Sequence, residues 1–437
     1  MAFQKLFNRF NYIKNHQGFQ KYFHNTKWLF IAQFSRLIAG FLVGVWVARY
    51  FGPTKFGIFS YVLAFTSLFA GIAKLGLDGI IVRDLVNEPE KRNIYLGTAF
   101  WLKIIGALLV LGLIAIAVQF TSNDAITNLY IFIIASGLIF QSFEVIDFYF
   151  QSKVLSKFVS LSQMAQIFLS SLLKVFFILT HAGLIWFVIV SGFDQITLAA
   201  SLLFAYKYQK LPNFFRYFDL GTAKKFLRSS WPYIFSSISI SIYMGIDKVM
   251  INNMLGNREV GIYSAGIKFA TIWYFIPMLI TNSLFPAIIN AKNLNIELYN
   301  KRLRRLYTFM IWISISIALP ITFLGHYLIT FFYGAKYIGA GEVLEIYIWS
   351  NVFVFLGVAS GKYLLAENYT KISLYTTFAG MIINVFLNII LIPKYGIYGA
   401  AISAVISYFV ATFFIGLIPK TNKQAILMIK SIIPRSI

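Results

Sequence analysis

Two stretches of this sequence repeat one pattern: "FGPTKFGIFSY" occupies residues 51–61 and "LGNREVGIYSA" occupies residues 255–265. The glycines that match at a constant offset of 204 residues are Gly52, Gly57, Gly256 and Gly261. The first glycine of each stretch can take a positive φ at the end of one helix, and the second lets the next helix begin close beside it. Each stretch is therefore predicted to form a tight turn between two helices.

A second pair of stretches supports an internal duplication. "THAGLIW" at residues 180–186 resembles "IPKYGIY" at residues 392–398, so that Gly183 matches Gly396 at an offset of 213 residues, and Gly399 follows three positions later. Two similar hairpins could arise by chance, but two pairs at corresponding places favour a repeat. We expect two six-helix lobes with the same orientation in the membrane, related by an axis along the membrane normal, as in many transporters.

The composition is that of a membrane protein. The chain has 437 residues, of which 59% are hydrophobic and 12% are charged, and its mean hydropathy is +0.74. A bilayer core about 30 Å thick needs about 20 apolar residues per helix, and helices satisfy their own backbone polar groups in lipid. We therefore predict an all-α polytopic membrane protein with about twelve transmembrane helices in two lobes around a central cavity. The predicted spans are 28–50, 58–80, 94–119, 126–150, 158–180, 184–206, 231–254, 259–288, 306–332, 340–366, 372–392 and 397–419.

The positive charges fix the expected orientation. With a cytoplasmic N-terminus, 26 of the 38 Lys and Arg residues fall in cytoplasmic segments, and only Lys55, Arg258, Lys336 and Lys394 fall in outer loops. This asymmetry places both termini in the cytoplasm. It also accounts for the formal charge of +23 without nucleic acid as a partner.

The same placement divides the chain into parts. The N-terminal segment alternates basic and aromatic residues without a continuous apolar core, so it is expected to lie on the inner membrane surface rather than to act as a cleaved signal peptide. The predicted parts are a cytoplasmic basic amphipathic arm at 1–27, an N-terminal lobe at 28–206, a cytoplasmic linker at 207–230, a C-terminal lobe at 231–419 and a cytoplasmic tail at 420–437.

Catalytic signatures are missing from the sequence. It contains no Walker A motif, dinucleotide fingerprint, nucleophile elbow or HExxH pair, it has no cysteine, and its four histidines are scattered. We expect no cofactor, no metal site and no enzymatic activity. Without an ATP site, energy would come from an ion gradient, the membrane potential or the gradient of the cargo.

Three stretches carry a resemblance to a known family: "GPTKFGIFSYVLAF" (52–65), "GLDGIIVRDL" (76–85) and "NVFLNIILIPKYGIYGAAIS" (384–403). The sequence resembles the polysaccharide transporter family of oligosaccharide, or O-antigen, flippases over essentially the whole chain. That family shares a superfamily with the multidrug and toxin extruders and the lipid II flippases. The most specific matching positions are Asn384, Asn388, Pro393, Gly396, Gly399, Ala400 and Ala401. The two extra C-terminal spans of lipid II flippases are not matched, which disfavours a peptidoglycan precursor as cargo.

The resemblance implies a flippase of the bacterial inner membrane. Its cargo would be an oligosaccharide joined by pyrophosphate to a polyprenyl lipid, moved from the cytoplasmic to the outer leaflet by alternating access. The headgroup would cross the cavity while the tail stays among membrane lipids. One alternative is an ion-coupled multidrug extruder of the same superfamily, which should favour acidic residues in its lumen. Another is a membrane glycosyltransferase or polymerase, which the short outer loops disfavour.

Charged residues inside the predicted spans are the candidate site, because a charge at the bilayer centre costs about 2.5–3.5 kcal/mol on insertion scales. Arg36 lies near the middle of the first span, and Lys268 lies in a span interrupted by Pro277 and Pro286. An Arg fork and a mobile Lys charge suit a pyrophosphate. Snorkelling or a structural ion pair is the alternative for each. The predicted pyrophosphate- and sugar-binding residues are Arg36, Lys268, Lys174, Arg49 and Lys74.

Each of the other charged residues in or near the spans has two possible roles. Lys174 could instead pair with Glu144 or Asp147, while Arg49, Lys74, Lys103 and Lys362 lie close enough to span ends to snorkel. Coupling to a proton or sodium ion is assigned to Asp247, Asp147 and Glu144, although Asp247 could instead pair with a neighbouring helix. Asp78 and Arg83, with Asp84, are candidates for a cytoplasmic gate or for a solvated face. Polar liners such as Gln141, Asn384 and Asn388 could equally form interhelical hydrogen bonds.

Overall fold

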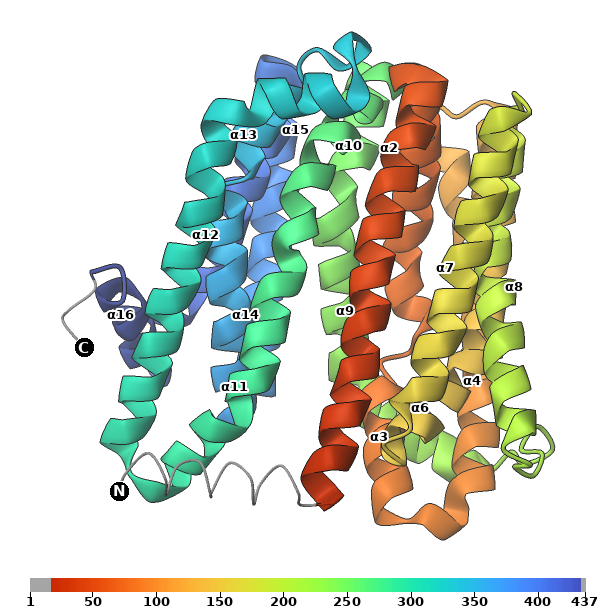
Figure 1. The fold of residues 1–437 in the computed structure, drawn as a ribbon, viewed down its shortest axis with the longest axis vertical. Helices are drawn as coiled ribbons and strands as arrows, with labels where there is room; N and C mark the ends of the chain where they lie inside the picture. The colour runs from red at the N-terminus through yellow and green to blue at the C-terminus, as the bar shows by residue number, and fades with distance from the viewer. Residues whose placement is uncertain (1–16, 434–437) are drawn as a thin grey trace. The chain divides into compact units, whose positions relative to one another are not determined.

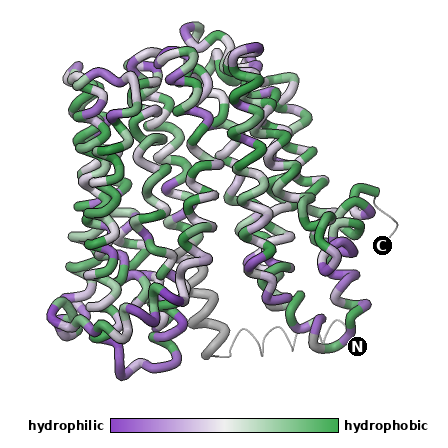
Figure 2. The backbone as a smooth tube through the Cα atoms, turned by 180° about the vertical axis from the view of Figure 1, so that it is seen from behind, coloured by the Kyte–Doolittle hydropathy of each residue, from purple (hydrophilic) through white to green (hydrophobic). Residues whose placement is uncertain are grey.

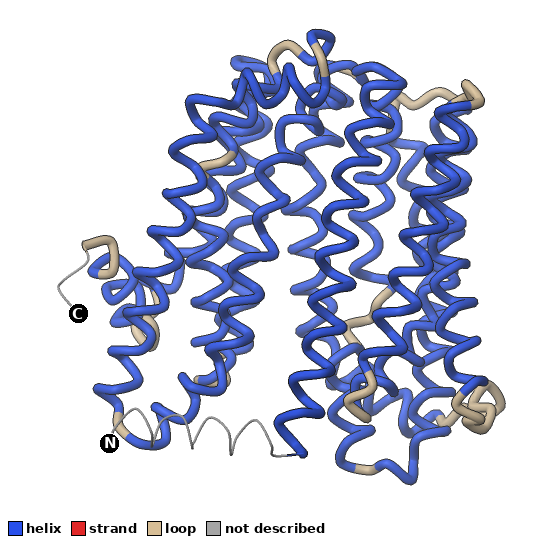
Figure 3. Tube along the Cα trace, in the orientation of Figure 1, coloured by secondary structure: helices blue, strands red, loops and turns tan. Residues whose placement is uncertain are grey.

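The computed structural model describes residues 17–433, and this part of the chain consists of helices and turns without a strand (Figure 1, Figure 3). Residues 1–16 of the predicted arm and 434–437 of the predicted tail lie outside the described residues. The first elements are α2 (Gln17–Ala73), α3 (Asp78–Asn87), η1 (Pro89–Lys91), α4 (Arg92–Ala117), η2 (Val118–Phe120), α5 (Ala125–Ser136), η3 (Gly137–Glu144), α6 (Val145–Ser152), α7 (Ser156–Leu179) and α8 (Leu184–Tyr208). They are followed by α9 (Leu220–Leu255), α10 (Asn257–Thr271), η4 (Ile272–Tyr274), α11 (Phe275–Leu294), α12 (Ile296–Tyr333), η5 (Ala335–Tyr337), α13 (Ala340–Tyr347), α14 (Ser350–Ala366), α15 (Thr370–Phe413), η6 (Phe414–Leu417) and α16 (Asn422–Lys430).

Ten helical stretches among the described residues are long and apolar enough to cross a membrane. The twelve predicted spans fall on these ten, because Phe30–Asn87 and Lys371–Leu417 each cover two of them. Hydrophilic residues gather at the connections between helices (Figure 2). Large apolar side chains such as Phe168, Phe204 and Phe331 are more than 70% exposed, as expected for side chains that face lipid. The chain is an all-α multi-pass membrane protein.

Glycines bend the two longest helices where the sequence repeats. Gly52 has φ 70° and ψ 175° inside α2, and Gly256, which precedes α10, has φ 92° and ψ 176°. Gly396 has φ 60° and ψ −140° inside α15. These values lie where an L-residue is strained, so each glycine turns the backbone without a connecting loop. Gly52 and Gly256, which match in the repeat, adopt nearly the same conformation, whereas Gly183, which matches Gly396, has φ −68° and ψ 168°.

The second glycines of the repeat explain why the pattern occurs twice. A Cβ added to Gly57 would lie 1.7 Å from the carbonyl oxygen of Asn257, and one added to Gly261 would lie 2.0 Å from that of Pro53. Pro53 and Asn257 are themselves separated by the repeat offset of 204 residues. The two turns therefore pack on each other through equivalent positions, as in a two-fold contact, and only glycine permits this approach.

The described residues form two compact units, which we treat separately. Within the described residues, unit 1 comprises residues 17–44, 72–117 and 132–231, and unit 2 comprises residues 45–71, 118–131 and 232–433. The glycine contact lies within unit 2. The predicted lobes at 28–206 and 231–419 follow the sequence repeat rather than these contacts, and they remain a prediction.

In unit 1, the predicted linker is part of the core. Phe214 and Phe226 are fully buried, the indole Nε1 of Trp101 donates a hydrogen bond to the Phe215 carbonyl at 2.8 Å, and the Asp219 amide donates to Thr98 Oγ1 at 3.0 Å. Phe214, Phe226 and the buried side chains of α4 form one apolar cluster. Aromatic side chains of the predicted linker at 207–230 thus complete the unit 1 core, and its cytoplasmic location remains a prediction.

In unit 2, the C-terminal helix is docked in a similar way. Gln424 of α16 donates a hydrogen bond to the hydroxyl of Tyr307 on α12. Met428 of α16 is fully buried in the same apolar cluster as Tyr307. Glu367, after α14, accepts hydrogen bonds from Lys292 at 2.9 Å and from the hydroxyl of Tyr299 at 3.0 Å. These contacts tie the ends of α11, α12 and α14 together.

Candidate functional site

A polar cavity of about 220 Å³ lies within unit 1. Its walls come from helices that the sequence predicts to cross the membrane. The lining residues are Arg36, Lys74, Gln141, Glu144, Asp147, Val159, Gln163, Gln166, Gln195, Leu198 and Leu202. Four residues of the predicted site, Arg36, Lys74, Glu144 and Asp147, thus meet in one place.

An unusual helical segment supplies one wall of this cavity. Residues 126–150 were predicted as one regular helix, but η3 is a 3₁₀ helix of eight residues between α5 and α6. Side chains three residues apart eclipse each other in a 3₁₀ helix, and runs longer than about four residues are uncommon. Gln141 and Glu144 are three residues apart in η3, which explains why both line the same cavity, and Asp147 follows in the first turn of α6.

Close glycine packing brings the opposite wall near. A Cβ on Gly137 would lie 3.0 Å from the Gly192 carbonyl oxygen of α8 and 3.3 Å from Cγ of Gln195. The small residues let η3 and α8 approach, and this places Gln195 beside the η3 wall. Gln163 and Gln166 are three residues apart on α7, so they lie on one helix face.

The carboxylates of the cavity have defined partners. Lys103 Nζ lies 2.9 Å from Glu144 Oε2 and 5.0 Å from the centre of the Phe148 ring, and Gln151 donates to Asp147 Oδ1 at 2.9 Å. The Lys103 side chain is only 1% exposed. The expectation that Lys103 snorkels was therefore wrong: the ion pair with Glu144 and the aromatic ring hold it inside the unit.

Arg36 and Gln141 are two further polar residues that line the cavity. Arg36 is exposed, and its Nη2 donates to Gln33 Oε1 one turn earlier on α2. Gln141 Oε1 is buried and accepts no hydrogen bond from any residue that the structure describes. The cavity therefore combines two cations, two engaged carboxylates and four amides.

Unit 2 contains a sealed polar cluster around Asp247 of α9. Asp247 is 5% exposed, and it accepts hydrogen bonds from the hydroxyl of Tyr263 at 2.8 Å and from Asn388 Nδ2 at 2.7 Å. Asn388 Nδ2 also donates to Asn384 Oδ1 at 3.3 Å. Within the described part of the chain, Asn388 Oδ1 and Asn384 Nδ2 are buried without hydrogen-bond partners.

The other predicted cations lie elsewhere. Lys174 of α7 pairs with Asp194 of α8 at 3.6 Å in unit 1, so the predicted alternative pairing with Glu144 or Asp147 was wrong, because Lys103 and Gln151 engage those carboxylates. Arg49 of α2 and Lys268 of α10 are exposed residues of unit 2.

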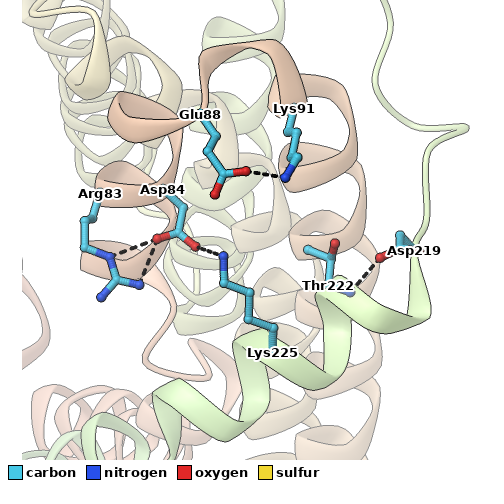
Figure 4. A network of polar contacts seen from close by, with 7 residues as sticks. All are labelled: Arg83, Asp84, Glu88, Lys91, Asp219, Thr222 and Lys225. Atoms are coloured by element: carbon cyan, nitrogen blue, oxygen red, sulfur yellow. Dashed lines mark hydrogen bonds and ion pairs between the residues drawn. The ribbon is translucent and has the colours of Figure 1, made fainter.

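Of the predicted gate residues, Arg83 and Asp84 belong to a network that joins α3 to α9 in unit 1. Asp84 is 5% exposed and lies 2.8 Å from both Arg83 Nη2 and Lys225 Nζ, so α3 is linked to the first turns of α9. Asp78 is the first residue of α3 and lies outside this network of described contacts. Figure 4 shows the residues of the network and its surroundings: Arg83, Asp84, Glu88, Lys91, Asp219, Thr222 and Lys225.

The fold defines the class of the protein. It is similar to the inward-facing conformation of a multidrug resistance MATE family transporter, with a TM-score of 0.70 at 15% identity over 91% of this chain and 96% of that chain. It is also similar to the lipid II flippase MurJ in an inward closed conformation, with a TM-score of 0.68 at 18% identity over 94% and 90% of the two chains. The chain has the fold of these membrane transporters.

The sequence then places the chain within this class. The profile of the polysaccharide biosynthesis protein family matches residues 23–292, so the chain belongs to that family, and the MatE profile matches residues 232–390. The chain is similar to the capsular polysaccharide biosynthesis protein CapF of Staphylococcus aureus, at 25% identity over 89% of this chain and 96% of the relative. It is also similar to the probable low-salt glycan biosynthesis flippase Agl15 of Haloferax volcanii, at 23% identity over 88% and 80% of the two chains. The predicted resemblance to the polysaccharide flippases is thus confirmed at the family level.

Three residues of the cavity were missed by the sequence interpretation, which concentrated on charge. Gln163, Gln166 and Gln195 are neutral and give no penalty comparable to that of a buried ion. A signal was nevertheless present, because glutamine recurs three positions apart in the span at 158–180 and again in the next span.

Proposed function

We propose that the protein is a flippase that moves a polyprenyl-pyrophosphate-linked oligosaccharide from the cytoplasmic to the outer leaflet of the bacterial inner membrane. The polar cavity within the membrane-spanning helices of unit 1 is the observation that supports it most directly. Each polar group left unpaired in hydrocarbon costs several kcal/mol, so a sugar headgroup needs such a lining in order to cross. The printed names of CapF and Agl15 agree with a glycan cargo.

The cations are proposed to hold the pyrophosphate. Arg36 offers a planar fork that binds phosphate oxygens in pairs, and Lys74 adds a mobile point charge in the same cavity. Lys268, Lys174 and Arg49 are proposed as further contacts along the route. Lys174 is the weakest of them, because Asp194 already neutralises it.

Movement is proposed to follow the sequence repeat. Residues 28–206 and 231–419 would act as two six-helix lobes around a central cavity, with both termini in the cytoplasm, and would rock in alternating access. Asp78 and Arg83 would belong to the cytoplasmic gate. Arg83→Ala should then raise the access of a water-soluble thiol reagent to a cysteine placed at Gln141, and equal access in both proteins rejects the gate.

Ion coupling is proposed at the Asp247 cluster. The Asp247 carboxylate and the unpartnered Asn388 Oδ1 offer oxygen ligands for a sodium ion, or a proton acceptor, in a buried place. Asp147 and Glu144 are further candidates, but Glu144 already forms an ion pair with Lys103. Asp247→Asn should make transport in proteoliposomes insensitive to imposed proton and sodium gradients. Retained sensitivity rejects Asp247 as the ion carrier.

A multidrug extruder is the second candidate function. The MatE profile match and the buried acidic cluster favour it, because a carboxylate suits a cationic drug. The two functions differ in their cargo. Ethidium accumulation should therefore be unchanged when the gene is deleted if the protein is a glycan flippase, and increased if it is an extruder.

Depletion of the protein in its native cell tests the proposal. The lipid-linked sugar should accumulate in the cytoplasmic leaflet, measured by its protection from a glycosidase added outside spheroplasts. Wild-type protein supplied from a plasmid should restore the original sidedness. Unchanged sidedness on depletion contradicts a flippase function.

A further inference from the structure

The amide side chains of the unit 1 cavity form a set of their own. Gln141 comes from η3, Gln163 and Gln166 from α7, and Gln195 from α8, and all four line the same polar space. An amide offers two N–H donors and a carbonyl acceptor, which matches a sugar hydroxyl that also donates and accepts. Four amides from three helices provide such groups around the cavity.

One of these amides lacks a partner. Gln141 Oε1 is buried, and none of the described residues donates a hydrogen bond to it. A buried acceptor left unsatisfied costs about 1–3 kcal/mol, and a bound hydroxyl would remove that cost. Gln141 itself lines the cavity, so a rotation of its amide would bring this unsatisfied acceptor to a hydrogen-bond donor bound there.

The carboxylates of the cavity disfavour the binding of a phosphate beside the glutamines. Glu144 and Asp147 line it as carboxylates, and Glu144 is already paired with Lys103. Like charges at short range disfavour a pyrophosphate between them, whereas carboxylates accept hydrogen bonds from hydroxyls readily. A neutral group rich in hydroxyls therefore suits the glutamine side of the cavity better than a phosphate does.

The size of the cavity limits what it can hold. Its volume of about 220 Å³ lies below the roughly 300–1,000 Å³ of typical sites for drug-sized ligands. One sugar ring is a suitable occupant, and a whole oligosaccharide is not. Arg36 is exposed and lines the same cavity, so a phosphate on Arg36 and a ring among the amides would belong to adjacent parts of one headgroup.

We propose that Gln141, Gln163, Gln166 and Gln195 form a subsite for one uncharged sugar ring, the ring joined directly to the pyrophosphate of the cargo. This inference rests on the proposed flippase function and specifies what part of the cargo is recognised. The amides form hydrogen bonds with the hydroxyls of the ring, and the cations bind the pyrophosphate. Selectivity for the sugar thus resides in neutral side chains of unit 1, while the more distal sugars are free to vary.

Binding of two lipids separates these roles. The full-length protein in lipid nanodiscs is titrated with lipid-linked oligosaccharide extracted from the native cell, and with polyprenyl pyrophosphate that carries no sugar. The test variant is Gln163→Leu/Gln166→Leu, which keeps the approximate side-chain volume but removes the amides. Gln209→Leu is the matched control, because Gln209 is an exposed glutamine at the end of α8 and outside the cavity.

The double variant should bind the sugar-bearing lipid about tenfold more weakly than wild type, while its affinity for the sugar-free lipid stays the same. Gln209→Leu should match wild type with both lipids. Equal affinity of the double variant and wild type for the sugar-bearing lipid overturns the subsite, and so does an equal loss for both lipids. If wild type binds neither lipid, the proposed function falls and the subsite falls with it.

Discussion

The polar cavity of unit 1 and the Asp247 cluster of unit 2 place carboxylates inside the membrane in different ways. In the cavity, Glu144 is neutralised by Lys103, and an open space of about 220 Å³ remains beside it. In the cluster, Asp247 is held by Tyr263 and Asn388, both of which are neutral donors, and it is 5% exposed. An open site whose acid is paired with a cation suits one polar sugar ring, and a sealed carboxylate without a cationic partner among these contacts suits a small ion.

The largest expected effect comes from breaking the ion pair of unit 1. Lys103→Met should lower the free energy of unfolding by about 3 kcal/mol, because Glu144, whose side chain is only 23% exposed, loses the cation that neutralises it. The change is measured as a shift of the thermal unfolding midpoint in detergent. Lys103→Met/Glu144→Gln is the control and should recover most of the loss, since it leaves no unpaired charge. A double variant as unstable as the single one would show that packing of the Lys103 stem, rather than the ion pair, stabilises the unit.

The second effect tests whether the unit 2 cluster is sealed. Asn388→Leu removes the donor to Asp247 Oδ1 and should cost about 2 kcal/mol, the range for a hydrogen bond to a charged group. Gln163→Leu, in the open cavity of unit 1, should change stability by less than about 0.5 kcal/mol, because water can replace the amide. Equal costs at the two positions would remove the distinction between a sealed cluster and an open cavity.

A third effect concerns transport rather than stability. Arg36→Ala and Lys268→Ala should each reduce the rate of headgroup translocation in proteoliposomes about tenfold, the loss of roughly 1.4 kcal/mol of phosphate binding. Arg49→Ala should have a smaller effect at equal expression. Arg36 has support from the structure because it lines the cavity, whereas the position of Lys268 on α10 of unit 2 adds no contact with a described polar cavity. Equal rates for all three variants would reject the assignment of these cations.

The sequence was sufficient for the fold because its signals are local and strong. Hydropathy located the long helices, and the repeated glycines located turns whose backbone has a positive φ at Gly52, Gly256 and Gly396. The contact between Gly57 and Asn257 was beyond its reach, because a repeat shows that two segments are alike without showing that they touch.

The candidate site was predictable only in part. Arg36, Lys74, Glu144 and Asp147 stood out because charge in a span is costly, and the structure brings them to one cavity. The 3₁₀ character of η3 could not be read from hydropathy, which is the same for both helix types, so the alignment of Gln141 with Glu144 on one face was not predicted, although each residue was a candidate. The ion pair of Lys103 with Glu144 was also missed. The position of Lys103 near the end of a predicted span does not show whether its long side chain points to the membrane surface or into the protein.

The smallest expected effect comes from a carboxylate outside the membrane, which contrasts with both buried sites. Asp219 precedes α9 and accepts a hydrogen bond from the Thr222 amide at 2.6 Å; the Thr222 hydroxyl first, and then this amide, lower the pKa of its carboxyl below the usual value. A lowered folded-state pKa contributes stability above the unfolded pKa of about 3.9, and the contribution is lost as the pH falls through the lower folded value. Asp219→Asn keeps a capping oxygen that does not titrate, so its unfolding midpoint should fall slightly less than that of wild type between about pH 5 and pH 3. Because Asp219 is solvent-exposed, the difference should be far below the shift caused by Lys103→Met, and a difference of equal size would mean that the linker, and not the ion pair in the membrane, limits the stability of unit 1.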